Sequence, residues 1–241
     1  MAESYATVEE LRADMNMTGT GDDATLERIL DAATKKIDTL CKRPDGFVAD
    51  TSASARYYVG SGEPTQWIDE CVSVTAVAVK DSSSEDEDSY TSWTIGIVGT
   101  TTSADCFPAR GSKKRPDYRT PAQTGKPYTM LVIGANADYS YFTGGGWTGR
   151  GGFRRALTYR GLPTVQVTAK WGYASSVPAD IKTACIMQAA RWYKRLQSAM
   201  ADATASVDLG QLLYMQQLDP DIAGILLDGG YVKKARGIGG I

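Results

Sequence analysis

The pattern of apolar and polar residues predicts helices near both ends of the chain. From Asp22 onward, apolar residues recur every three or four positions, which places them on one stripe of a helix that ends at the turn 44–46. Before it, Thr7 and Glu10 have the spacing of a capping box and predict a short helix that stops near residue 18. The stripe of the longer helix consists of Leu26, Ile29, Leu30, Ala33, Ile37 and Leu40.

A second long helix is predicted to begin at Pro178, because proline suits the first helical position, where its missing N–H leaves no hydrogen bond unmade. We expect this scaffold helix to pack on the helix of residues 22–40. Further along, Asp219-Pro220-Asp221 predicts a short last helix that stops at Gly229. The helically spaced positions of the scaffold helix are Pro178, Ile181, Cys185, Gln188, Ala189, Trp192, Leu196 and Met200.

Between these helices the pattern is that of β-strands. Residues 164–171 alternate so that Val165, Val167, Ala169 and Trp171 share one face, which predicts a strand with one buried side. Other runs rich in β-branched and aromatic residues occupy 55–60, 72–79, 90–98 and 127–133. We expect mobile loops at 81–89, 108–126 and 143–152, where acidic, basic or glycine-rich residues dominate.

The order of elements predicts an α+β fold. Helices that share a core are separated by about 130 residues of strands and loops, which indicates a small α-helical module with a large β-rich domain inserted between its second and third helices. The expected boundaries are 1–46 and 173–228 for the two parts of the helical module, 47–172 for the inserted domain, and 229–241 for a flexible tail.

The composition argues against most catalytic chemistry. The 241 residues include no histidine, which excludes Ser-His-Asp and Cys-His sites and the commonest general base. The four cysteines are far apart and predict buried reduced thiols rather than a zinc site. Catalysis would have to rest on carboxylates, Lys, Tyr or unpaired Ser, which argues against an enzyme without excluding one, and we expect no metal and no cofactor. No apolar run approaches the ~20 residues of a membrane span, and the N-terminus lacks the pattern of a signal peptide.

The net charge of −2 conceals an uneven distribution. Residues 1–107 contain 20 acidic and 8 basic residues, whereas residues 108–241 contain 8 acidic and 18 basic ones. Three interpretations stay open: two solvated faces, a subunit whose acidic part meets the basic part of a neighbouring copy, or contact with nucleic acid. The near-neutral total argues against a dedicated DNA-binding protein.

Two motifs that suggest chemistry are weak. Residues 144–149 match a GxGxxG pattern, but no helix of sufficient length and no acidic residue follow at the spacing of a dinucleotide site, so we expect a loop. Asp69-Glu70 and the acidic cluster 85–88 could supply a carboxylate pair for glycoside hydrolysis, although a solvated surface is the simpler interpretation. Three tryptophans could stack on a sugar, namely Trp67, Trp93 and Trp147.

The segment 229–241 is basic and rich in glycine, with a few apolar residues. It is either a disordered terminus or a segment that orders on a partner, along a groove or as an added strand.

Four stretches, taken together, resemble the head-to-tail connector (adaptor) proteins of tailed bacteriophages. The stretch 167–195, VTAKWGYASSVPADIKTACIMQAARWYKR, resembles the strand, turn and helix of that family. YATVEELRADM at 5–15 and DDATLERILDAATKKIDTLCKR at 22–43 resemble its first helices. LDPDIAGILLDGGYVKKARG at 218–237 resembles its closing helix and tail. The resemblance covers about half of the chain and leaves out the β-rich middle.

This resemblance implies a structural virion protein of the neck, between capsid and tail, that is assembled in the host cytoplasm. Such adaptors form a ring, usually of twelve subunits, beneath the portal protein. The ring extends the channel for double-stranded DNA, which passes without sequence recognition, and docks a head-closure or tail-completion protein. Alternatives are another neck component or a carbohydrate-binding or hydrolytic β domain. The residues implied as portal contacts are Asp219, Pro220, Ile222, Ile225, Tyr231, Lys233, Lys234 and Arg236.

Overall fold

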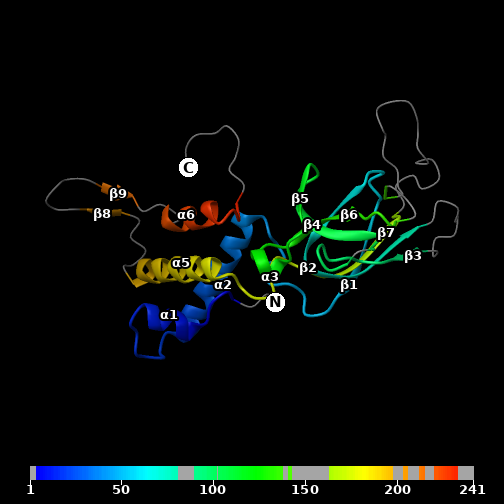
Figure 1. Cartoon of the computed structure of the whole chain (residues 1–241). Helices are drawn as coiled ribbons and strands as arrows, with labels where there is room; N and C mark the ends of the chain where they lie inside the picture. The colour runs from blue at the N-terminus through cyan, green and yellow to red at the C-terminus, as the bar shows by residue number, and fades with distance from the viewer. Residues whose placement is uncertain are drawn as a thin grey trace. The chain divides into compact units, whose positions relative to one another are not determined.

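The structure is a computed structural model of the chain, and it divides into two compact units (Figure 1). Residues 1–47 and 177–241 form what we call the helical unit, and residues 48–176 form the β unit. The structure describes residues 4–80, 90–101, 103–137, 141–142, 163–197, 203–205, 212–214 and 220–232.

The helical unit is built from both ends of the chain. As expected from its apolar stripe, α2 packs on α5, and the fully or almost fully buried residues along it include Leu26, Leu30 and Ile37. A short two-stranded hairpin, β8–β9, was not expected from the sequence. Within the described residues, no helix is long and apolar enough to span a bilayer. The elements are α1 Val8–Asp14, α2 Asp23–Cys41, α5 Ala179–Gln197, β8 Ala203–Ala205, β9 Leu212–Tyr214 and α6 Pro220–Asp228.

The helix starts follow local sequence signals to different degrees. The capping box predicted at Thr7 is confirmed, because its hydroxyl accepts from the Glu10 N–H and the Glu10 carboxylate accepts from the Thr7 N–H. Asp22 precedes α2 as expected, but its side chain does not cap that helix. Its carboxylate accepts a 2.6 Å hydrogen bond from the Tyr193 hydroxyl on α5. The predicted first helical residue, Pro178, immediately precedes α5, and its carbonyl accepts the N–H of Lys182.

The buried stripe of the scaffold helix α5 differs from the expected one at its C-terminal end. Ile181 and Cys185 are fully buried, as expected. Further along, Tyr193 is buried, whereas Trp192 and Leu196 are half-buried. The buried face of the helix is therefore shifted by one residue position at this end. The Tyr193 hydroxyl donates its hydrogen bond to Asp22, the residue that precedes α2. Met200 lies outside the described residues.

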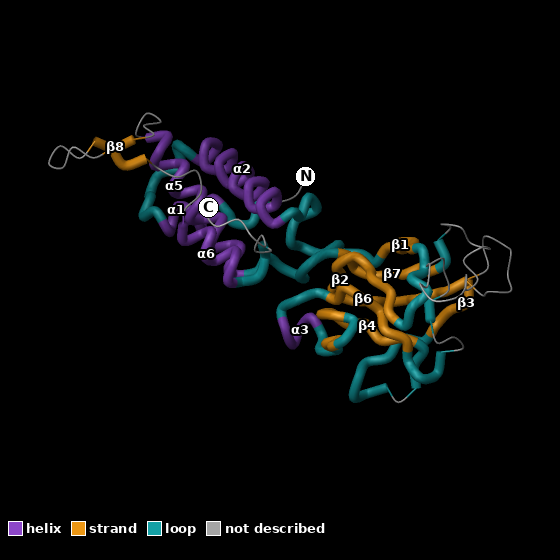
Figure 2. The backbone as a smooth tube through the Cα atoms, turned by 90° about the horizontal axis from the view of Figure 1, so that it is seen from above, coloured by secondary structure: helices purple, strands orange, loops and turns teal. Residues whose placement is uncertain are grey.

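The β unit contains a seven-stranded antiparallel sheet with the order β1-β7-β2-β6-β4-β5, and β3 pairs with β2 (Figure 2). The alternation predicted for residues 165–171 is confirmed, since Val165, Val167, Ala169 and Trp171 of β7 are buried in one core cluster. The elements are β1 Ser54–Tyr58, β2 Thr65–Lys80, β3 Tyr90–Trp93, β4 Cys106–Ser112, β5 Arg115–Asp117, α3 Pro121–Thr124, β6 Tyr128–Ile133 and β7 Val165–Trp171.

At the end of β7 the chain needs a glycine. Gly172 has φ +135°, and a Cβ atom there would lie 2.4 Å from the backbone of Ala49. Its N–H donates to the carbonyl of Glu70 on β2. The glycine of the WGY turn therefore lets two stretches of backbone approach more closely than any other residue would allow.

The expectation of a loop over residues 108–126 is corrected by the structure, which has β4, β5 and α3 there. Sequence patterning failed because this stretch carries prolines, glycines and many cations, all of which are uncommon in strands. The first residues of β4, Cys106–Ala109, pair with β6, and the β4–β5 pairing carries the ion pair of Arg110 with Asp117 directly opposite it. The other expected loops, 81–89 and 143–152, lie outside the described residues.

Candidate interaction surface on the C-terminal helix

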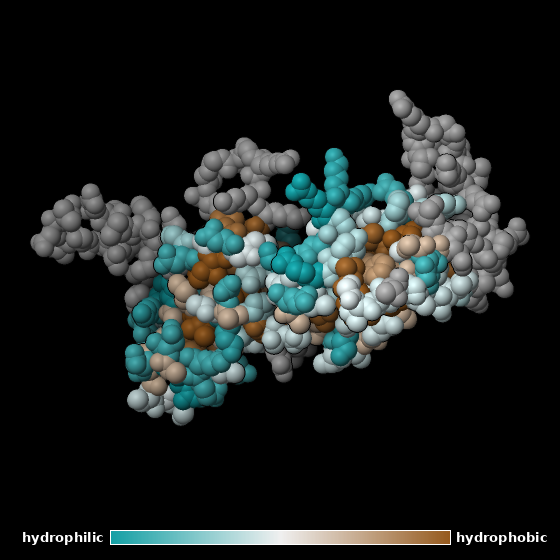
Figure 3. Space-filling model, viewed as in Figure 1, coloured by the Kyte–Doolittle hydropathy of each residue, from teal (hydrophilic) through white to brown (hydrophobic). Residues whose placement is uncertain are grey.

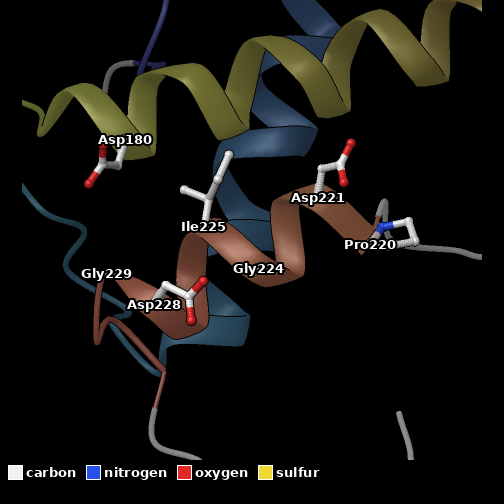
Figure 4. A pocket seen from close by; sticks show the side chains of 7 residues that line it. All are labelled: Asp180, Pro220, Asp221, Gly224, Ile225, Asp228 and Gly229. Carbon is white, nitrogen blue, oxygen red and sulfur yellow. The ribbon is translucent and has the colours of Figure 1, made fainter.

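Helix α6 separates its apolar residues into two groups. Pro220 opens the helix, as the sequence predicted, and Ile222 and Leu226 are buried in the unit. Gly224 and Ile225 instead line an open hollow against α5 (Figure 4). Ile225 is half-buried, so part of its side chain remains available to a partner.

The hollow combines an apolar centre with negative charge. Three carboxylates line it, from Asp180 on α5 and from Asp221 and Asp228 on α6. Ile225 projects between them in the view of Figure 4. The added Cβ of a side chain at Gly224 would meet nothing within 4 Å, so the wall is open at that point. The volume of about 590 Å³ would admit a few side chains of a partner, and the carboxylates favour basic ones.

The segment after α6 is tied back onto the unit. The N–H of Tyr231 donates to the carbonyl of Leu226, and Gly230 adopts φ +71° in this turn. The Tyr231 ring meets Phe47 edge-on, with ring centroids 5.5 Å apart. A Cβ atom at Gly229 would lie 2.4 Å from the Tyr231 ring, so the glycine makes this packing possible.

The structure thus places part of the expected portal-contact set. It brings Pro220 and Ile225 to one hollow, and Tyr231 lies nearby, with its hydroxyl 3.5 Å from the Asp180 carboxylate. Ile222 is fully buried, so its side chain supports the helix from inside the unit. The remaining candidates, Asp219, Lys233, Lys234 and Arg236, lie outside the described residues.

Beneath this surface, a polar network joins the two ends of the chain. The Tyr5 hydroxyl donates to the Asp38 carboxylate and accepts the N–H of Phe47 at 3.1 Å. The Tyr5 N–H donates to the Thr34 hydroxyl, which lies 3.5 Å from the Cys185 sulfur. Because Phe47 also packs on Tyr231, the network fixes the platform on which the C-terminal segment rests.

Burial shapes the protonation of this network. It raises the pKa of Tyr5, and the hydrogen bond to Asp38 raises it further, so the tyrosine stays a donor. Burial also raises the pKa of Asp38, against the opposing effect of the Tyr5 hydrogen bond. Sequence reasoning did not select these residues. The available signal was that Thr34 and Asp38 follow Leu30 at helical spacing, which puts two polar residues on the buried stripe.

All four cysteines are buried and form no disulfide, as the sequence predicted. Burial raises the pKa of Cys41 to about 11 and of Cys71 and Cys106 to about 12. It also raises the pKa of Cys185. Since the thiolate is the reactive form, these side chains act as small apolar residues of the two cores.

The carboxylate pair considered for hydrolysis has a structural environment in the β unit. Asp69 accepts hydrogen bonds from the Arg56 guanidinium at 2.8 Å and from the Tyr58 hydroxyl at 2.9 Å. An exposed, ion-paired aspartate lacks the apolar surroundings that prepare a carboxyl group to act as an acid. Of the three tryptophans, Trp93 is buried in the core, Trp67 is 44% exposed, and Trp147 lies outside the described residues.

The acidic half of the sequence, 1–107, and the basic half, 108–241, do not correspond to the two units. The helical unit contains 16 acidic and 13 basic residues, and the β unit contains 12 and 13. Both sequence halves contribute to each unit, so neither unit carries a large net charge. Attraction between units of neighbouring copies would have to come from local patches, such as the acidic hollow beside α6.

No protein-family model matches this sequence, and no curated protein is significantly similar to it. Among solved structures, the chain is similar to a chain of the neck of an empty GTA particle, computed with C6 symmetry, with 15% sequence identity and a TM-score of 0.45. The match covers 100% of this chain and 96% of that chain. At this identity and TM-score the likeness by itself transfers no function.

Proposed function

We propose that the chain is a structural protein of the neck of a tailed phage or phage-like particle. In this proposal it is a head-to-tail adaptor that forms a ring, of about twelve subunits by the resemblance of its sequence, beneath the portal. The ring extends the DNA channel and docks the next neck or tail component. The role involves no catalytic step.

The observation that carries the proposal is the composition of the helical unit. The stretches that resemble adaptor proteins, 5–43 and the helical part of 164–237, lie in one compact unit although the β unit separates them in sequence. Hydrogen bonds between Glu10 and Lys182 and between Asp22 and Tyr193 join the two parts directly. A module that forms from both ends of a chain and tolerates a large insertion between them suits a ring subunit.

The hollow beside α6 supports a partner at the position that the resemblance assigns to the portal. Ile225 and the three carboxylates around it form a surface with both apolar and electrostatic character. Interfaces of this kind place an apolar anchor at the centre and charged groups at the rim. The basic residues Lys233, Lys234 and Arg236 follow in the sequence and add a second charged element.

Co-sedimentation of the full-length chain with its portal protein tests the proposal. We expect Ile225→Asp to weaken the association at least tenfold, because it places a charge at the centre of the contact. Ile97→Asp is the matched control, since Ile97 is 54% exposed in the β unit and should leave portal binding unchanged. Equal binding by both variants and the unmodified chain would refute the assignment of this surface.

A charge reversal tests the basic tail separately. Lys233→Glu combined with Lys234→Glu is expected to weaken portal association, and Lys35→Glu combined with Lys36→Glu on α2 makes the same charge change elsewhere. If both double variants bind equally well, the tail does not contact the portal.

A further inference from the structure

The β4–β5 hairpin carries a concentrated positive charge. Between residues 110 and 126 there are six Lys or Arg residues and a single acidic one, Asp117. The hairpin projects from the β unit as a hydrophilic protrusion (Figure 3). Its tip is a two-residue loop, Lys113-Lys114, closed by the pair of Ser112 with Arg115.

The base of the hairpin is fixed by a branched ion pair. The Arg110 guanidinium donates to Asp117 at 2.5 and 3.1 Å and also to the Thr124 hydroxyl. Asp117 accepts from Arg119 as well, at 2.9 and 3.0 Å. The hydrogen bond from Arg119, and after it the one from Arg110, holds the pKa of Asp117 well below its usual range. The Asp117 carboxylate therefore stays charged at any physiological pH. The tip therefore stands on a rigid support.

Several cations of the hairpin are left without an acidic neighbour. Lys113 pairs with Glu63, and Asp117 serves both Arg110 and Arg119. Within the described part of the chain, Lys114, Arg115 and Lys126 form no ion pair. Residues 111–115 are all exposed. The protein thus maintains uncompensated positive charge on a narrow protruding element, where a large polyanion can reach it.

The chemistry of the tip favours phosphate over a protein partner. Protein interfaces place apolar and aromatic residues at their centre and contain few lysines there, whereas the exposed tip consists of glycine, serine and cations. Interfaces with DNA are strongly positive and need no apolar anchor, because neutralising phosphates releases counterions.

We propose that the β4–β5 hairpin contacts the phosphate backbone of double-stranded DNA through Lys114 and Arg115, with Lys126 at its base. The contact is independent of sequence and weak, with a Kd on the order of 10⁻⁴–10⁻⁶ M at physiological salt, which lets a duplex slide past. The inference depends on the proposed neck function for the source of the DNA. Binding by the isolated chain, however, can be measured without any particle.

Fluorescence anisotropy of a labelled duplex of about 20 base pairs, titrated with the full chain from about 25 to 200 mM NaCl, tests the proposal. We expect log Kd to depend linearly on log salt, equally for two unrelated sequences. Lys114→Ala with Arg115→Ala should reduce the slope by about 2, and Lys126→Ala alone by about 1. Lys35→Ala with Lys36→Ala on α2 removes the same charge and should leave the slope unchanged.

Three results would overturn the proposal. The unmodified chain could fail to bind DNA at the lowest salt, or the two double variants could weaken binding equally, which would indicate general attraction. The hairpin variant could also bind DNA normally and instead lose association with other copies or with the portal, which would identify an acidic protein surface as its partner. If the chain binds DNA as expected but is absent from particle necks, the DNA contact is upheld and the proposed neck function is refuted.

Discussion

Side-chain contacts in the helical unit join opposite ends of the chain, whereas those of the β unit stay within one continuous segment. Thr34 lies against Cys185, and Glu10 pairs with Lys182, across the whole of residues 48–176. In the β unit, even distant pairs such as Tyr57 and Gln166 belong to that segment. The helical unit therefore cannot form before the C-terminal part of the chain is present, while the β unit contains everything needed for its own core.

The largest expected effect follows from cutting the chain at the boundaries of the units. A fragment of residues 48–176 should keep the sheet, since its core cluster lies within it. A fragment of residues 1–47 should lose its helices, because an amphipathic helix obtains most of its stability from tertiary packing, which α2 makes with α5. Circular dichroism of the two fragments provides the measurement. An unfolded 48–176 fragment or a helical 1–47 fragment would contradict the comparison.

Removing one hydroxyl should destabilise the helical unit alone. In Tyr5→Phe, Asp38 loses its buried donor and the Phe47 N–H loses its acceptor, at a cost of about 1–3 kcal/mol in the free energy of unfolding. Tyr57→Phe is the control in the β unit, where the 56% exposed side chain should change stability by less than about 0.5 kcal/mol. Hydrogen-exchange rates measured for the backbone amides of α2 and of β7 would show which unit each substitution destabilises.

The buried amide of Gln188 on α5 should lower the free energy of unfolding of the helical unit. Gln188 is fully buried, and neither amide atom has a hydrogen-bond partner among the described residues. We expect Gln188→Met, of similar size, to raise the free energy of unfolding by about 1 kcal/mol. Gln197→Met at the exposed end of α5 should have little effect. Destabilisation by Gln188→Met in a denaturant titration would mean that the amide has a partner.

The smallest expected effect concerns pH. The hydrogen bonds from Lys182 and from the Thr7 backbone hold the pKa of Glu10 below its ordinary value of 4.5. A lowered pKa in the folded state stabilises the unit above pH 4.5, and this contribution is lost as the pH falls through the folded value. Glu10→Gln should remove that part of the pH dependence, as should Lys182→Met. The measurement is the free energy of unfolding from denaturant titrations between pH 6 and 3. If both variants lose stability with falling pH as steeply as the unmodified chain, Glu10 does not contribute to the pH dependence.

The sequence predicted those elements whose signals are local. The stripe of α2, the capping box at Thr7 and the alternation of β7 are patterns within a few residues, and each is confirmed. Strands β4 and β5 were missed because they lack apolar alternation: Arg110 lies opposite Asp117, Gly111 has φ +97°, and only Cys106–Ala109 pair with β6. The Tyr5–Asp38 contact was equally invisible, since it forms only when two distant segments pack.

The candidate surface was partly predictable for the same reason. Pro220 and Ile225 were selected from a helix-start signal and a resemblance, and the structure places them at one hollow. The role of Ile222 could not be read from the sequence, because periodicity assigns Ile222 and Ile225 to neighbouring positions without saying which one the unit covers. The contribution of Asp180, from another helix, required the packing of α5 on α6.

Imaging of purified particle necks tests the central claim most directly. The account predicts a ring of this chain immediately beneath the portal, with the helical unit, and in particular Ile225 on α6, against the portal. A neck that lacks the chain, or a ring in a lower layer with no portal contact, would contradict it and favour a head-closure or tail-completion protein.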